Sequence, residues 1–106
     1  MRNLLALVAL GLCLQSCFND KPRVLVFSKT KGYRHESIPA GKVALQKLGA
    51  ENGFEVDTTE NAAYFHEDSL KRYRAVVFLS TTGDVLDYPQ QNAFKRFIQA
   101  GGGYVG

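Results

Sequence analysis

Two continuously apolar runs constrain the fold of this chain more than any other feature of its sequence. They cover residues 23–28 and 75–80 and are built largely from valine, leucine and phenylalanine. Such runs are typical of strands buried on both faces, as in a parallel sheet covered by helices. Residues 54–58 alternate in polarity and predict a strand nearer the sheet edge, and residues 103–106 predict the start of a fourth strand.

A helix is predicted between the first two strands. Ser37 is a suitable N-cap, and Pro39 fits the first helical turn. Gly49 and Gly53 are expected to end the helix. Apolar residues recur through it at helical spacing: Ala40, Val43, Ala44 and Leu48.

A second helix is predicted before the fourth strand, and a short helical turn at residues 68–72. Apolar side chains of the second helix fall on one face, with Lys95 and Arg96 on the other. The apolar face consists of Ala93, Phe94, Phe97 and Ile98. Strands that alternate with helices in this way indicate an α/β fold with a parallel sheet and helices on both faces.

The first residues have the layout of a signal peptide. Arg2 precedes an apolar stretch over residues 4–14, which is shorter than the roughly 20 residues that a membrane-spanning helix needs. The following Leu-Gln-Ser-Cys run resembles the lipobox of bacterial lipoproteins and implies lipidation at Cys17. We therefore expect a signal peptide over residues 1–16, a lipidated tether over residues 17–22 and an extracytoplasmic location. The alternative is a soluble secreted protein in which Cys17 is an ordinary thiol.

Charge and cysteine content exclude several classes of function. Cys13 lies within the signal peptide, so the folded part contains no disulfide framework, cysteine-ligated metal or thiol nucleophile. Loss of residues 1–16 removes one charged side chain, Arg2, and lowers the formal net charge from +3 to +2. With so weak a charge and no long basic run, nucleic acid is not an expected partner. We also expect no metal and no cofactor.

The last residue lies inside a predicted strand. A doubly wound sheet usually continues to five or more strands, and a shorter one would leave a sheet edge uncovered. We therefore expect residues 23–106 to be the N-terminal part of a longer domain, cut at the fourth strand.

Ligands of parallel sheets bind beyond the carboxyl ends of the strands, and three polar segments are predicted to lie there: residues 28–37, 61–66 and 80–84. The first is the densest in functional groups. His35 is a candidate proton donor or acceptor, assisted by Asp84. Arg34 is a candidate for holding a ligand oxygen, and Tyr33 lies beside it. The competing interpretation is a solvated loop in which His35 helps to cap the helix and Asp84 belongs to a turn.

Several motifs together resemble the ThuA-like domain of the trehalose-utilisation proteins. They are Val-Leu-Val-Phe at residues 24–27, Tyr-Arg-His-Glu-Ser-Ile at 33–38, Thr-Gly-Asp-Val-Leu at 82–86, and the glycine-rich stretch from residue 101. The resemblance implies a flavodoxin-like three-layer fold with sheet order 2-1-3-4, within the class I glutamine amidotransferase-like superfamily. It also implies a role in carbohydrate metabolism. The matching site positions are Arg34, His35, Ser37, Gly83 and Asp84.

Three functions fit this resemblance. The first is a sugar-processing enzyme that acts on a sugar or glycan-derived small molecule, with catalytic residues His35 and Asp84 and ligand-binding residues Tyr33, Arg34, Ser37 and Gly83. The second is a non-catalytic carbohydrate-binding module of a larger surface protein. The third is a flavin-binding, flavodoxin-like protein, suggested by the hydroxyl residues and the glycine after the first strand. Amidotransferase chemistry is not expected, because the folded part has no nucleophilic cysteine.

Overall fold

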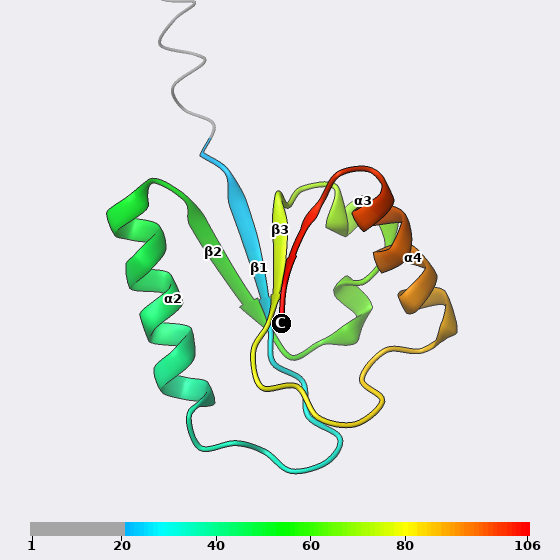
Figure 1. Ribbon diagram of the computed structural model, residues 1–106, viewed down its shortest axis with the longest axis horizontal. Coiled ribbons are helices and arrows are strands. Elements are labelled where there is room, and N and C mark those ends of the chain that lie inside the picture. Colours follow the sequence, from blue (N-terminus) through cyan, green and yellow to red (C-terminus); the bar gives the residue numbers. More distant parts are fainter. Residues whose placement is uncertain (1–20) are drawn as a thin grey trace, which may run out of the picture.

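The computed structural model describes residues 21–106 (Figure 1). The predicted signal peptide and Cys17 lie outside the described residues. The strands are β1 (Arg23–Phe27), β2 (Glu55–Thr59), β3 (Ala75–Phe78) and β4 (Gly103–Val105), and the helices are α2 (Ile38–Asn52), the 3₁₀ turn η1 (Ala62–Tyr64), α3 (Glu67–Leu70) and α4 (Tyr88–Gln99). Among residues 21–106, no helix is both long and apolar enough to cross a membrane.

The four strands form one parallel sheet in the order β2-β1-β3-β4, as predicted. α2 lies on one face of this sheet, and α3 and α4 lie on the other (Figure 1). β1 is central, and its last three residues, Leu25 to Phe27, are fully buried. Their continuous apolar run therefore does mark a strand covered on both faces.

An aromatic cluster fills the space between the sheet and α4. Phe65 packs edge-to-face against Phe27, with ring centroids 4.7 Å apart, and lies 5.5 Å from Phe94. Phe78 and Tyr104 extend the cluster along β3 and β4. Edge-to-face contacts of this kind add to the stability gained by burying aromatic area. This face carries most of the apolar core.

α4 begins with a capping box in which Asp87 accepts from the backbone N–H of Gln90 and the Gln90 side chain accepts from the backbone of Asp87. Its packed face contains Ala93, which is buried, and Phe94 and Phe97, which are partly buried. The prediction for Ile98 is wrong, since 40% of its surface is exposed. At about 100° per residue, Ile98 lies beyond the border of the stripe that faces the sheet.

α2 packs on the sheet through Ile38, which is fully buried, and through small residues. A Cβ atom on Gly49 would lie 2.6 Å from the carbonyl oxygen of Phe54, and one on Gly41 would lie 3.0 Å from the Leu79 side chain. The apolar repeat at helical spacing is instead largely exposed, 65% at Val43 and 48% at Leu48. The face of α2 that packs on the sheet is therefore not the face that the apolar repeat predicts. Glycine allows the close approach to the sheet but carries no hydropathic signal.

The ends of α2 differ from prediction in two ways. Gly53 ends the helix with a left-handed backbone (φ 78°), as expected, but Gly49 lies within the helix and is buried. Ser37 occupies the N-cap position without a side-chain cap hydrogen bond. Its hydroxyl is directed to another residue of the same loop, described next.

Candidate functional site

Three loops leave the carboxyl edge of the sheet, along the lower side of Figure 1. The first loop comprises residues 28–37 between β1 and α2, the second comprises residues 60–66 after β2, and the third comprises residues 79–87 between β3 and α4. Chain order reverses between β1 and β3, so the first and third loops flank the switch point, where parallel sheets bind ligands.

The first and third loops are hydrogen-bonded to each other. The backbone N–H of Lys31 donates to the carbonyl of Thr82 (2.9 Å), and the Thr82 hydroxyl donates to the carbonyl of Tyr33 (2.6 Å). Gly83 follows with φ 78°, and a Cβ atom there would lie 3.1 Å from that of Lys31. The predicted meeting of these loops is confirmed, and a glycine is required where they touch.

Arg34 ties the first loop to the second. Its guanidinium forms an ion pair with Glu60 (Nη1–Oε1 2.5 Å), and the other carboxylate oxygen of Glu60 accepts from Lys42 of α2 (3.4 Å). The hydrogen bond from Arg34, with the charge of Lys42, lowers the pKa of Glu60 despite some burial. Sequence reasoning missed Glu60, although its position directly after β2 is a signal for a residue at this edge.

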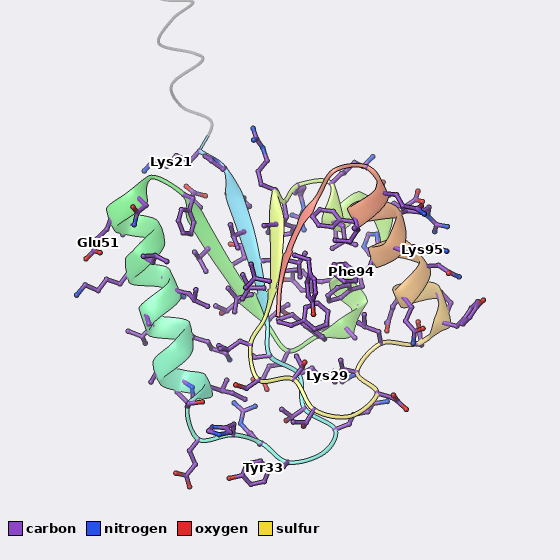
Figure 2. All side chains as sticks on the ribbon, in the orientation of Figure 1. Lys21, Lys29, Tyr33, Glu51, Phe94 and Lys95 are labelled. Carbon is purple, nitrogen blue, oxygen red and sulfur yellow. The ribbon has the colours of Figure 1, made fainter. Side chains whose placement is uncertain are left out.

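His35 and Ser37 form a local unit in the first loop. The His35 Nδ1 atom lies 3.3 Å from the backbone nitrogen of Ser37, whose N–H donates to it, and 2.8 Å from the Ser37 hydroxyl oxygen. Since Nδ1 accepts from the backbone, the neutral ring carries its proton on Nε2. The ring of Tyr33 stands edge-on to His35 at 6.1 Å, is 69% exposed and lies on the outer side of the loop (Figure 2).

The remaining candidates lie apart from this unit. Asp84 is exposed, and its carboxylate forms no hydrogen bond with any other residue of the described chain. Arg34 pairs with Glu60 instead of Asp84. His66 lies at the start of α3, where its Nε2 atom is 2.8 Å from the Ser69 hydroxyl. Arg34, His35 and Asp84 therefore lie on an open surface at one edge of the sheet.

Two further features bear on the chemistry of the molecule. A hollow of about 480 Å³ lies between α3 and α4 at the opposite edge of the sheet, where Tyr73, Arg74 and Gly102 contribute to its lining. No group of three or more histidine, cysteine or carboxylate side chains within residues 21–106 is arranged to hold a metal ion.

Comparison with known proteins identifies the family. The model of the ThuA family, described as trehalose utilisation, matches residues 23–106. The chain belongs to the ThuA family. A crystal structure of a protein from Bacteroides uniformis ATCC 8492, named for its likeness to ThuA, shares the fold with a TM-score of 0.69 and 22% sequence identity. No curated protein matches the chain.

The ThuA match confirms the fold expected from the sequence motifs and supports a carbohydrate-related role. It includes all three loops of the carboxyl edge. The structural alignment with the Bacteroides uniformis protein covers 80% of this chain and 35% of that one. The ThuA chain described here thus spans about a third of that protein's length.

Proposed function

We propose that this ThuA domain binds a sugar or a glycan-derived small molecule at the carboxyl edge of its sheet. The observation that supports this most strongly is the bonding between the first and third loops, through Lys31, Thr82 and Tyr33. These bonds fix the backbones of the two loops against each other. The exposed side chains that the loops carry therefore keep their relative positions before a ligand binds. A site organised in advance loses less conformational freedom on binding.

The side chains of this edge suit the chemistry of a sugar. A sugar ring has an apolar face that packs on an exposed aromatic ring, a role suited to Tyr33. Its hydroxyl groups accept hydrogen bonds from Arg34 and from the Nε2–H group of His35, and donate to a carboxylate such as Asp84. Ser37 orients His35, and Gly83 keeps the third loop close to the first.

We further propose that the domain works outside the cytoplasm, tethered to a bacterial membrane by lipid on Cys17. The support is the signal-peptide layout of residues 1–16 and the lipobox-like run that follows. Metabolic labelling with a fatty acid tests this directly, because Cys17→Ser should abolish both labelling and cleavage. Label that persists on the Cys17→Ser protein would refute the lipid anchor.

Acid/base chemistry by His35 is a second candidate function at the same site. It is favoured by the 2.8 Å contact between Nδ1 of His35 and the Ser37 hydroxyl. In the tautomer that carries the proton on Nδ1, this hydroxyl accepts from Nδ1–H, and the lone pair of Nε2 is left to take a proton from a ligand. Histidine is a common general acid and base in proteins, which suits this role. Asp84 would assist by accepting from a sugar hydroxyl.

The proposal is tested with the full-length protein against a panel of sugars that includes trehalose. Calorimetry or NMR titration measures binding, and product analysis measures turnover. His35→Ala should weaken binding, while His66→Ala, the matched control in the second loop, should not. A sugar-processing enzyme would lose turnover far more than binding in His35→Ala. If that variant stays folded and keeps full binding and activity, the assigned site is wrong.

A further inference from the structure

We propose that Glu60 selects ligands by charge, so that the site accepts neutral sugars and rejects sugar acids and sugar phosphates. This inference rests on the proposed sugar site at the carboxyl edge and names the class of sugar that it takes. Glu60 would be a ligand contact as well as a barrier to anions. Three structural observations support it: the place of Glu60, its two cationic partners and its partial exposure.

Glu60 lies beside the loop that carries the candidate site. It follows β2 directly, and that strand end is held against β1 by a hydrogen bond from the Ser28 backbone N–H to the carbonyl of Thr59 (3.0 Å). Arg34 reaches Glu60 from the first loop, and Lys42 reaches it from α2. The Glu60 side chain is nevertheless 44% exposed, so that a ligand at this edge can touch it.

The two cations would otherwise form an anion site. The planar fork of an arginine matches a carboxylate or phosphate group, and a neighbouring lysine adds a second positive charge. In this protein Glu60 already supplies a carboxylate to both, one oxygen to Arg34 and the other to Lys42. The lowered pKa of Glu60, caused chiefly by the hydrogen bond from Arg34, keeps this carboxylate ionised at neutral pH. An anionic ligand at Arg34 therefore meets a like charge at close range.

A neutral sugar does not encounter this repulsion. The paired groups of Arg34 and Glu60 present hydrogen-bond donors and acceptors side by side, since a guanidinium has five N–H groups and a carboxylate has about four lone-pair sites. Two adjacent hydroxyl groups can accept from Arg34 and donate to Glu60 without breaking the ion pair. The arrangement thus favours hydroxyl groups over charged ones.

Trehalose and trehalose 6-phosphate provide a matched pair of probes, because they differ in a single anionic group. Binding of each to the full-length protein is measured for the wild type, for Glu60→Gln, and for Glu36→Gln. The Glu36→Gln control removes the same charge from an exposed position of the first loop. Inorganic phosphate is titrated as a third probe, followed by NMR signals of the Arg34 side chain.

The wild type should prefer trehalose over its phosphate by about two- to fivefold, a factor typical of a partly exposed charge contact. Glu60→Gln should largely abolish that preference and bind inorganic phosphate at Arg34, whereas Glu36→Gln should behave as the wild type. Equal binding of both sugars by the wild type would overturn the inference, as would equal effects of the two substitutions. If neither sugar binds the wild type, the proposed sugar site fails. The titration with inorganic phosphate would then test the exclusion of anions by Glu60 on its own. That exclusion is supported only if Glu60→Gln binds phosphate more tightly than the wild type does.

Discussion

Two segments of this protein have nearly the same short sequence, but one is exposed and the other is packed into the core. Tyr-Arg-His-Glu at residues 33–36 precedes α2, and Tyr-Phe-His-Glu at residues 64–67 runs into α3. Both follow strands that end at the same edge of the sheet. In the first segment Tyr33 and Arg34 are exposed, whereas in the second Phe65 is buried in the aromatic cluster with 2% of its surface exposed.

The residue after the tyrosine accounts for the difference. Arg34 carries a charge that is costly to bury, so it stays at the surface and pairs with Glu60. Burial of the apolar Phe65 side chain is favourable, and its ring contacts Phe94 of α4, so the second loop packs against that helix. The histidine that follows contacts a serine hydroxyl at 2.8 Å in both segments, through Nδ1 in His35 and through Nε2 in His66, so the two rings turn different nitrogen atoms to other partners. One segment is therefore suited to binding and the other to stability.

The largest effect that would test this comparison is expected from Phe65→Ala. Loss of a buried phenylalanine that contacts three other aromatic rings should lower the free energy of unfolding by about 3 to 5 kcal/mol. Arg34→Ala, at the matched position of the first loop, should cost less than about 1 kcal/mol. Chemical denaturation of the full-length protein measures both. Similar losses in the two variants would mean that the two segments do not differ as described.

A second effect is expected from Tyr73, which follows the second segment and α3 and binds a residue of β2. The Tyr73 hydroxyl donates to Asp57 of β2 (2.7 Å), and the same carboxylate accepts from Arg23. Asp57→Ala should therefore lower the free energy of unfolding by about 1 to 2 kcal/mol, the range expected for a partly exposed charged hydrogen-bond partner. Lys71 and Asp68, a largely exposed ion pair nearby, give the control, since Asp68→Ala should have almost no effect.

The same contact sets the pH dependence of stability. Burial acts to raise the pKa of Asp57, but hydrogen bonds from Tyr73 and Arg23 outweigh it and leave the pKa below its usual value of 3.8. Its contribution to stability is thus present above that value and is lost as pH falls through the lowered pKa. Burial raises the pKa of Tyr73 to about 12, with the hydrogen bond to Asp57 adding to the shift. That contribution is complete below the usual tyrosine value of 10.0 and is lost as pH rises through about 12. Thermal unfolding of Tyr73→Phe across pH should show a weaker alkaline loss than the wild type.

A third, smaller effect is expected where the first loop meets the third. Thr82→Val removes the hydroxyl that donates to the carbonyl of Tyr33, which should cost about 1 kcal/mol of stability. Faster amide hydrogen exchange over residues 31–34 should accompany it, because the first loop loses a fastening. Thr81→Val is the neighbouring control. Unchanged exchange in Thr82→Val would show that the backbone bond from Lys31 suffices to hold the loops together.

The continuous apolar runs predicted the two central strands, because such runs are typical of strands covered on both faces. The strand order was implied by the resemblance to the ThuA-like domain, and the structure confirms it. The packed face of α2 was not predicted, because Gly41 and Gly49, which lie on it with the buried Ile38, carry no hydropathic signal. Nor did the sequence predict the pairing of Arg34 with Glu60, residues that lie 26 positions apart. Contacts between loops depend on the folded sheet, so local patterns place residues such as His35 at the correct edge without showing which partner each one meets.

The smallest effect on stability and the sharpest effect on binding are expected from the two tyrosines of the paired motifs. Tyr33 is exposed, so Tyr33→Ala should change the free energy of unfolding by less than about 0.5 kcal/mol. If its ring stacks on a sugar, affinity should nevertheless fall by about fivefold, since an aromatic contact of this kind contributes roughly 1 kcal/mol. Tyr64 packs against the aromatic core, and Tyr64→Ala should show the reverse, a loss of stability with unchanged affinity for sugar. Calorimetric titration and denaturation of both variants in the full-length protein compare the two motifs directly. Should Tyr33→Ala bind sugar as well as the wild type while Tyr64→Ala does not, the ligand surface would belong to the second segment, because the exposed ring of the first would then have no role in binding.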